Sequence, residues 1–497
     1  MWSLVLLLSS VLAPVDAASL LFTDATIISY DFSTNHTQIL RDSSLLVQGD
    51  RIVELYNGTT PSSYPNDTTV VNATGKIISP GFINTHHHLW QTGYKTLASN
   101  TTLAQYFQRY GEFGPSIQHM TAEDKYLAQI AGALELVNTG TTTILDHASG
   151  DSSEETEDSI LQATLESGVR IFHAFSVHDL GTATNWTVDL QIQKLRSLAT
   201  DPRLTNNSLV NLGLSFDAFP SAPKSQIEEL WSIVRDNDLS LVTTHHLAGP
   251  YLNDNSPTLL DSLGWLNTST PVIFSHSSFI SSSDIHVLRQ RNQYISATPE
   301  SEMHYGHGNM YSHLIQDQAS LGVDTHFTFS ADMVQQARLW LQNLRLRLYE
   351  KVLKDLQVPW NNPMTTEQAF HLITRAGALA LRRDDLGVIV PGAKADLAIF
   401  NADTPNLLGA EYDPVAAIIL HSNTGDVEDV VVGGEFVKRE GKILYEGYGE
   451  VKRRFRESAR KIQRVWSEME WENYWEDSLF LGVTEYGTAE EIDTQRG

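Results

Sequence analysis

Short apolar runs alternate with amphipathic stretches through the middle of the chain. Eight of these runs have the length and composition of strands, and helical periodicity follows most of them. In chain order they are ISPGFINTH, TTTILDH, VRIFHAFS, LVNLGLSFDAF, LSLVTTHH, PVIFSH, QYISATP and HFTFSAD. Repeated right-handed strand–helix–strand units close on themselves, so the pattern predicts an α/β protein with a (β/α)8 TIM barrel over residues 79–385.

The two ends of the chain carry a different pattern, in which short strands are separated by polar stretches. Residues 18–78 contain SLLFTDATIISYD and SLLVQGDRIVELYN, and residues 386–447 contain DLAIFNAD and DVVVGGEFVKREGKILYEG. We expect these segments to form one small β-sandwich domain built from both chain ends. Residues 448–497 are predicted to be a C-terminal helix and tail, because apolar residues such as Ile462 and Trp466 recur there at helical spacing.

The first residues have the pattern of a secretory signal peptide. The apolar run from Leu4 to Leu12 is too short to span a bilayer, and small residues precede a cleavage point after Ala17. The sequence therefore predicts a signal peptide over residues 1–17 and a secreted protein, with a buried N-terminal segment as the alternative. Eight Asn-x-Ser/Thr sequons support export, since they are acceptors for N-glycosylation. They begin at Asn35, Asn57, Asn66, Asn72, Asn100, Asn185, Asn206 and Asn267.

The charge and the cysteine content exclude several classes of function. The chain has 34 Lys and Arg against 60 Asp and Glu, and its formal net charge is −26. A polyanionic nucleic acid or an anionic membrane is not an expected partner for such a surface, whereas a small-molecule substrate is. The chain has no cysteine, which rules out disulfides, thiolate nucleophiles and Cys-ligated metals. The composition is compatible with a homo-oligomer as well as with a monomer.

Histidines at the ends of the predicted strands are the strongest chemical signal. The first barrel strand leads into PGFINTHHHLWQ, and side chains two residues apart on a strand share a face. His86 and His88 can therefore both point into the barrel while His87 points away. Two imidazoles on one face form half of a metal site.

Three other predicted strands end in candidate ligands. The fifth ends in His245 and His246, of which only one can face inward, the sixth ends in His276, and the eighth ends in Asp332. The carboxyl ends of barrel strands meet at one mouth. These side chains are therefore predicted to surround one divalent ion together with the first histidine pair.

The motifs as a set resemble the amidohydrolase superfamily, in its branch of cytosine deaminase-like and triazine hydrolase-like (chlorohydrolase) enzymes. The segments that carry the resemblance are PGFINTHHHLWQ, HHLA, FSH, TPESEM and FSAD, and it extends to about residue 447. It implies the metal ligands His86, His88, His246, His276 and Asp332. Residues 209–219, the predicted fourth strand, contain no Lys, so the binuclear arrangement of the superfamily is not expected. A single ion follows, with Zn²⁺ favoured and Fe²⁺ as the alternative.

One position departs from that family. Its deaminases and chlorohydrolases carry a glutamate three residues after the fifth-strand histidine, whereas this chain has Gly249 there. That glutamate moves a proton to a heteroaromatic ring nitrogen, so its absence argues against ordinary purine, cytosine or triazine deamination. His304 follows the seventh strand and is a candidate substrate contact, as are Trp90 and Gln91 after the first strand.

The chemistry implied is hydrolysis of a non-peptide C–N bond in a small amide, cyclic amide or amidine. Asp332 would take a proton from water and pass it to the leaving group, and His276 would polarise the electrophile or bind the metal. Two alternatives remain at this point. One is a lyase, a dehydratase or decarboxylase on the same scaffold, and the other is a non-catalytic binding protein that keeps the metal as a structural staple.

Overall fold

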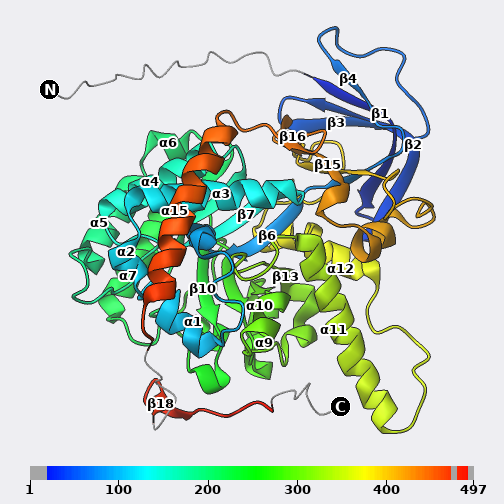
Figure 1. The fold of residues 1–497 in the computed structure, drawn as a ribbon. Coiled ribbons are helices and arrows are strands. Elements are labelled where there is room, and N and C mark those ends of the chain that lie inside the picture. Colours follow the sequence, from blue (N-terminus) through cyan, green and yellow to red (C-terminus); the bar gives the residue numbers. More distant parts are fainter. Residues whose placement is uncertain (1–18, 472–477, 491–497) are drawn as a thin grey trace, which may run out of the picture.

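The computed structural model describes residues 19–471 and 478–490, and it contains a barrel with a smaller β domain beside it (Figure 1). The predicted signal peptide over residues 1–17 lies outside the described residues. Eight parallel strands pair in chain order to form the barrel. They are β6 (Phe82–His87), β7 (Thr141–Ala148), β8 (Arg170–Ser176), β9 (Val210–Ser215), β10 (Val242–His246), β11 (Val272–His276), β12 (Tyr294–Ala297) and β13 (Ala319–Leu321).

The barrel closes where the chain leaves its last strand. The backbone N–H of His88 donates to the carbonyl of Asp324 (3.1 Å), and the N–H of Asp324 donates to the carbonyl of His86 (2.9 Å). These two bonds join the segment after β13 to β6. The predicted (β/α)8 barrel is thereby confirmed, and seven of its eight strands coincide with the apolar runs of the sequence.

The eighth strand differs from the expected one. The sequence favoured residues 326–332, but the strand is the short segment Ala319–Leu321. Gly322 follows it so closely against β6 that a Cβ there would lie 2.8 Å from the carbonyl oxygen of His86. Three residues are too few for a clear alternating pattern, so the longer apolar run at residues 326–332 gives the stronger strand signal.

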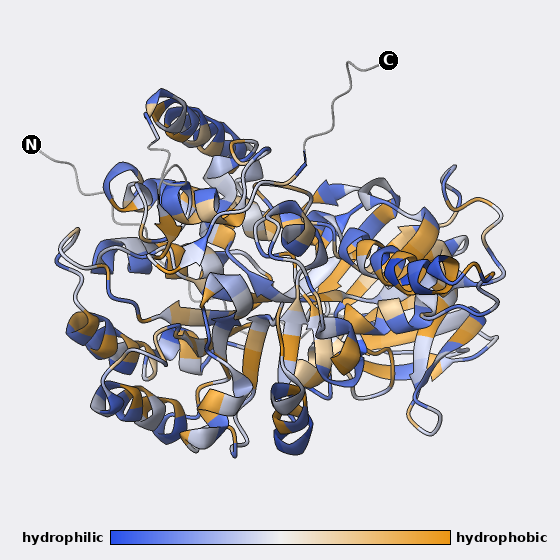
Figure 2. Cartoon of the chain, turned by 90° about the horizontal axis from the view of Figure 1, so that it is seen from below, coloured by the Kyte–Doolittle hydropathy of each residue, from blue (hydrophilic) through white to orange (hydrophobic). Residues whose placement is uncertain are grey.

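Helices surround the barrel, and several of them begin with a side-chain cap. Thr121 and Asp124 form a capping box at the start of α3, and Ser281 and Asp284 form one at the start of α9. The helices between β6 and the end of the barrel are α1 (Leu103–Arg109), α2 (Ser116–His119), α3 (Ala122–Asn138), α4 (Glu154–Glu166), α5 (Val188–Leu198), α6 (Pro202–Thr205), α7 (Lys224–Asp236), α8 (Pro257–Ser262), α9 (Ser282–Arg291), α10 (Pro299–His304), α11 (Met333–Lys354), α12 (Thr366–Leu372) and α13 (Arg375–Ala380). Figure 2 shows hydrophobic residues concentrated on the strands and hydrophilic residues on the outer faces of the helices.

The two ends of the chain form the β domain, as predicted. Its strands make one mixed sheet in the order β17-β16-β15-β14-β5-β1-β2-β3, with β4 beside β1, and β14 from the C-terminal part pairs antiparallel with β5 from the N-terminal part. The bounds are β1 (Leu20–Asp31), β2 (His36–Gln48), β3 (Arg51–Tyr56), β4 (Thr69–Asn72), β5 (Lys76–Pro80), β14 (Leu397–Asn401), β15 (Val427–Val432), β16 (Glu435–Arg439) and β17 (Lys442–Ile443), with the short helix α14 (Pro414–Ala416) between β14 and β15. The eight sequon asparagines all lie at exposed positions, most of them in or near this domain and the barrel loops.

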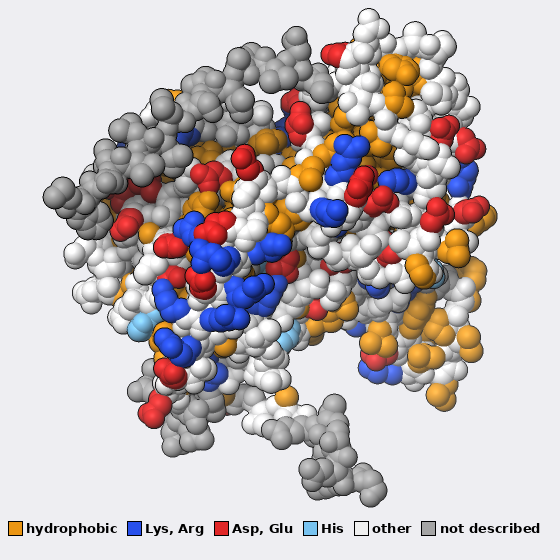
Figure 3. Space-filling model, turned by 45° about the horizontal axis from the view of Figure 1, so that its top comes forward, with side chains coloured by type: hydrophobic (Ala, Val, Ile, Leu, Met, Phe, Trp, Pro, Cys, Tyr) orange, Lys and Arg blue, Asp and Glu red, His pale blue; other side chains and the backbone are white. Residues whose placement is uncertain are grey.

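After the β domain the chain returns to the barrel as α15 (Tyr448–Glu468). Trp466 donates from Nε1 to the carbonyl of Arg109 (2.8 Å), and its ring centroid lies 4.9 Å from that of Tyr94. Basic and acidic side chains are mixed on the outer face that α15 covers (Figure 3), where Arg454 contacts Glu123 at 2.9 Å. A short hairpin, β18 (Leu479–Phe480) and β19 (Thr484–Glu485), follows. Among the described residues, no helix combines the length and the apolar character needed to cross a bilayer.

Candidate functional site

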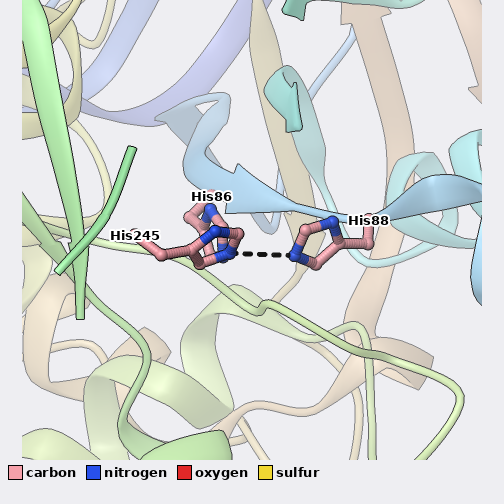
Figure 4. Close-up of side chains that lie close together, drawn as sticks. All are labelled: His86, His88 and His245. Atoms are coloured by element: carbon pink, nitrogen blue, oxygen red, sulfur yellow. Dashed lines mark hydrogen bonds between the residues drawn. The ribbon is translucent and has the colours of Figure 1, made fainter. Parts of the chain in front are cut away.

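Ligand atoms from four barrel strands converge at the mouth. The Nε2 atoms of His88 and His245 are 3.3 Å apart, and the two rings face each other beside His86 (Figure 4). Oδ1 of Asp324 lies 3.3 Å from Nε2 of His86 and 3.5 Å from Nε2 of His88. His276 brings a further ligand atom close to those of His86 and Asp324. Four imidazoles and one carboxylate therefore form two overlapping groups of ligand atoms that share His86.

A partner on Nδ1 orients each of these imidazoles. The contacts are His86 with Oγ of Ser275 (2.8 Å), His88 with the carbonyl of His147 (3.0 Å), His245 with Oδ2 of Asp217 (2.7 Å) and His276 with Oγ1 of Thr298 (2.8 Å). A carbonyl or carboxylate can only accept, so Nδ1 of His88 and of His245 carries the hydrogen. Such outer contacts fix the ring and turn Nε2 toward a metal.

Burial and mutual repulsion disfavour positive charge on most of the cluster. Burial lowers the pKa of His86 well below its ordinary value, and the neighbouring imidazoles of His245 and His88 lower it further. Burial also lowers the pKa of His276 well below its ordinary value. Nε2 of His86 is completely buried, and none of the described residues offers it a hydrogen bond. A neutral, unpartnered imidazole nitrogen facing a carboxylate is a suitable ligand for a divalent cation.

His245 is the exception among the four imidazoles. Burial lowers its pKa, but the adjacent Asp217 carboxylate outweighs burial and raises that pKa to about 9. Asp217 is held ionised, because the charge and hydrogen bonds of His245 outweigh burial and lower the pKa of the carboxyl. The protonated His245 therefore donates from Nε2 to Nε2 of His88. A cation bound at this point would replace that proton, as metal binding commonly does.

The structure does not bring His246 to the cluster, contrary to the expectation from the sequence. Its Nδ1 lies 3.3 Å from Oγ of Ser277, and its ring packs near Phe274. Partners in a parallel ladder share a face, and His245 pairs with Ser275, whose Oγ contacts His86 inside the barrel. His245 is therefore the inward residue of the pair.

Asp332 also lies away from the cluster, and Asp324 takes the place expected for it. Asp332 caps α11, where Oδ1 accepts from the N–H of Val334 (2.9 Å) and Oδ2 lies 3.4 Å from Oγ1 of Thr424. The acid that follows the true eighth strand is Asp324. Burial raises its pKa, but His276, His88 and a hydrogen bond from Ser301 outweigh burial and hold it below the ordinary value.

His86, His88 and His276 lie together as expected, although His276 gets there by an unexpected route. Its neighbour Ser275 faces the barrel interior, so alternation along β11 alone would turn His276 outward. His276 and Ser277 instead adopt φ values of 68° and 53°, in the left-handed region that non-glycine residues seldom enter. The backbone turn at the strand end places His276 beside His86, with ring centroids 5.0 Å apart.

Of the three predicted substrate contacts, Trp90 and Gln91 are buried and His304 is half-buried. Trp90 is fully buried, with the Nζ of Lys125 3.6 Å from its ring centroid. Gln91 donates from Nε2 to the hydroxyl of Tyr106 (2.7 Å), and Nε2 of His304 donates to the carbonyl of Ala98 (3.1 Å).

Four residues near the cluster are not among the site residues that the resemblance implies, although the strand ends left His245 open as the alternative to His246. They are His245, Asp324, Asp217 and His307, the last with its ring centroid 4.9 Å from that of His276. Asp217 lies near the end of the fourth apolar run and just after β9, so the rule that strand-end acids meet at the mouth predicts it. His307 lies in a Gly-rich loop that has no comparable signal.

Neither position that could hold the family's glutamate carries a carboxylate. Counting three residues on from His245 gives Ala248, and counting from His246 gives Gly249. Both residues have positive φ, and a Cβ on Gly249 would lie 2.6 Å from the ring of Phe279. A glutamate side chain therefore has no room at position 249 unless Phe279 moves.

Comparisons with known proteins agree with this fold. A 5-methylthioadenosine/S-adenosylhomocysteine deaminase of Thermococcus kodakarensis is 26% identical over 412 residues, which are 80% of this chain and 89% of that protein. A 5'-deoxyadenosine deaminase of Methanobrevibacter smithii is 25% identical, over 85% of this chain and 94% of that protein. The solved structure of a zinc-bound adenosine deaminase from Xanthomonas campestris superposes with a TM-score of 0.75 at 18% identity, covering 91% of this chain and all of that one. The solved structure of a zinc complex of atrazine chlorohydrolase from Arthrobacter aurescens superposes with a TM-score of 0.70 at 20% identity. The superposition covers 88% of this chain and 100% of that one.

The sequence profile of the family described as "Amidohydrolase family" matches residues 77–437. This span takes in every barrel strand, the converging histidines, β14, β15 and the first part of β16 of the β domain. The chain therefore belongs to the amidohydrolase family and is a hydrolase of carbon–nitrogen bonds other than peptide bonds.

Proposed function

We propose that this protein is a secreted, metal-dependent hydrolase that uses water to cleave a non-peptide C–N bond in a small amide, cyclic amide or amidine. The observation that carries the proposal is the clustering of the ligand atoms of His88, His245, His276 and Asp324 around His86. The relatives include adenosine-type deaminases, and the amino group and adjacent ring nitrogen of an aminopurine form an amidine, so aminopurine nucleosides belong in the test panel. The missing carboxylate at positions 248 and 249 still argues against ordinary deamination of a purine ring, so they are not the favoured member of the class.

The five side chains fit one divalent cation, with Zn²⁺ favoured and Fe²⁺ as the alternative. All five donors are imidazole nitrogens or a carboxylate, which suit both ions, and Nε2 of His86 is buried without a hydrogen-bond partner among the described residues. A divalent ion in this set supplies Lewis acidity, which polarises a C=O or C=N group and makes water acidic enough to ionise near neutral pH.

The protein's own groups then handle the protons. Asp324 is ionised, and one of its oxygens lies at the centre of the cluster while the other accepts a hydrogen bond from Ser301. It is the group placed to accept a proton from the attacking water and to return it to the leaving nitrogen. His276 is held by Thr298 near Asp324 and orients the electrophilic group of the substrate.

Secretion is proposed from the signal-peptide pattern of residues 1–17 and from the eight sequons. Their asparagines are exposed, as glycan attachment requires. We expect protein secreted by a eukaryotic expression host to begin at Ala18 by N-terminal sequencing. We also expect its mass to fall after treatment with an N-glycosidase, and an unchanged mass together with an uncleaved leader would refute secretion.

Paired variants test the metal-dependent hydrolase directly. His245→Ala and His246→Ala remove neighbouring imidazoles, and Asp324→Ala and Asp332→Ala remove the two candidate acids. Purified proteins are analysed for bound metal, and turnover of a panel of amides, cyclic amides and aminopurine nucleosides is followed in ¹⁸O-labelled water. A hydrolase transfers the label to its product, whereas a lyase does not.

We expect His245→Ala and Asp324→Ala to lose both metal and turnover. His246→Ala should keep both, and Asp332→Ala should lose only the cap of α11, which costs about 1 kcal/mol of stability. The ligand set is wrong if His246→Ala and Asp332→Ala lose metal and turnover while His245→Ala and Asp324→Ala keep both. The hydrolase proposal fails if metal-loaded protein turns over no compound of the panel.

A further inference from the structure

The described C-terminal segment, residues 478–490, lies at the mouth of the barrel. Its strands β18 and β19 pair around a tight turn, and its red ribbon passes by α1 in the lower part of Figure 1. Phe480 is 8% exposed, whereas its neighbours Leu479 and Leu481 are 45% and 69% exposed. The matched region of the amidohydrolase family ends at residue 437, so this segment lies outside that region.

Phe480 inserts between two loops of the mouth. Its ring is stacked on Phe107 of α1 with 6.3 Å between centroids, and it meets Tyr251 edge-on at 5.8 Å. Phe107 follows the first barrel strand, and Tyr251 follows the fifth. Phe480 therefore bridges two sides of the opening through which a substrate reaches the metal cluster.

Aromatic rings continue from Phe480 down to the cluster. The centroid of Tyr251 is 6.3 Å from that of His307, and the centroid of His307 is 4.9 Å from that of His276. On the other side of the opening, Phe107 adjoins Tyr106 at 5.9 Å. A continuous series of ring contacts thus connects Phe480 and the two loops it touches to His276 of the cluster.

The segment is held in place by apolar contacts. Within residues 19–471 and 478–490, no hydrogen bond or ion pair joins residues 478–490 to the barrel, and the ring contacts of Phe480 are what attach it. Apolar contacts are not directional, so the segment can move aside to admit a substrate and then settle against an apolar part of it.

We infer that Phe480 is a specificity-determining residue for the hydrolase proposed above, and this inference rests on that proposed function. The segment closes over the bound substrate, and Phe480 packs on an apolar or aromatic group that extends from the reacting carbon toward the mouth. Substrates that carry such a group are preferred, and a closed roof also limits the access of water and solutes to the cluster.

The experiment uses the metal-loaded full-length protein, Phe480→Ala and the control Leu481→Ala, which removes an exposed leucine from the same turn. The first readout is independent of activity: the rate at which a soluble chelator removes the metal. Phe480→Ala should lose metal several-fold faster than the unmodified protein, and Leu481→Ala should not. Equal rates in all three proteins would overturn closure of the mouth by the segment.

The second readout compares adenosine with 5'-methylthioadenosine, in which an apolar methylthio group replaces the 5'-hydroxyl at the end away from the reacting carbon. Dissociation constants are measured by calorimetry, and KM and kcat are measured where turnover occurs. The unmodified protein should prefer the methylthio compound, and Phe480→Ala should lose roughly 10-fold of that preference in Kd or KM with little change in kcat, the size expected for one apolar contact.

The outcomes separate the two proposals. If Phe480→Ala and Leu481→Ala change the preference equally, or if the unmodified protein shows no preference, the role of Phe480 is overturned whether or not hydrolysis occurs. If the preference is present and depends on Phe480 but no compound of the panel is hydrolysed, the proposed function fails and the binding role stands.

Discussion

Arg170→Ala should destabilise the protein far more than the loss of a comparable arginine on the surface. Arg170, on β8 of the barrel, donates from Nε to Oδ2 of Asp396 (2.7 Å) and from Nη2 to Oδ1 (3.1 Å), just before β14 of the β domain. The two side chains are 1% and 4% exposed. Alanine at position 170 leaves the Asp396 carboxylate buried without its counter-charge, which costs roughly 3–5 kcal/mol.

This cost converts into a measurable change of the unfolding temperature. The unfolding entropy of globular proteins is about 2.1 cal/mol/K per residue, so a cooperative unit of roughly 450 residues loses about 1 °C in Tm for each kcal/mol. We therefore expect Arg170→Ala to unfold about 3–5 °C lower by calorimetry. The control is Arg203→Ala, because Arg203 makes the same type of contact with Asp201 at an exposed position. Its Tm should stay within about 1 °C of the unmodified protein.

A double variant separates loss of charge from loss of packing. Asp396 also accepts a hydrogen bond from the N–H of Gly433 (2.7 Å), so Asp396→Asn keeps an acceptor for that amide. Arg170→Met combined with Asp396→Asn removes both charges and should regain at least half of the lost stability. The argument from desolvation is refuted if Arg170→Ala and Arg203→Ala lower Tm equally, or if the double variant is less stable than Arg170→Ala.

Three further predictions concern the site and its surroundings. Asp217→Ala removes the acceptor that orients His245 and should weaken metal binding roughly 10- to 100-fold in a competition titration, whereas Asp254→Ala, which removes an exposed acid near His246, should not. Removal of the metal by a chelator should lower Tm, and Zn²⁺ at about 1,000 times its Kd should restore roughly 4 kcal/mol of stability, while an unchanged Tm would argue against a site in the folded state. Burial lowers the pKa of Lys125 to about 7, so between pH 10 and pH 7 the unfolded chain takes up a proton that the folded chain resists. Lys125→Met should therefore unfold at a higher temperature than the unmodified protein, by a larger margin at pH 7 than at pH 9, and a margin independent of pH would contradict this assignment.

The sequence predicts most of the barrel because its strands are long apolar runs. Seven of the eight runs become strands, and the paired segments at the chain ends join through β5 and β14. Burial of a strand on both faces requires such runs, so they are visible without any knowledge of tertiary contacts. The strand Ala319–Leu321 is the exception, since it is too short to stand out and is defined by closure of the barrel against β6.

The kinds of ligand are predictable, but two of the individual ligands in the candidate site are not. His245 and His246 are adjacent, and a shift of one residue exchanges the two faces of a strand. The choice between them depends on the register of β10 against β11, in which His245 lies beside Ser275. Sequence similarity favoured His246, because the family motif continues from it to Gly249. Register is a property of the assembled sheet, so the motif alone could not decide.

The candidate ligands lie at the points where regular strand geometry stops. The irregular backbone there turns their side chains toward the cluster, and strand alternation in the sequence does not predict that direction. Alternation would turn His276 away from the interior, but its positive φ reverses the side chain, and β6 has a register irregularity between Asn84 and His87 around His86. Asp324 likewise has φ of 70° just beyond β13. Strained backbone of this kind persists only when surrounding contacts hold it, and it is common at functional sites. Ser275, Thr298 and Ser301 are the neighbours that hold these side chains, so their removal should loosen ligand geometry before it affects the fold.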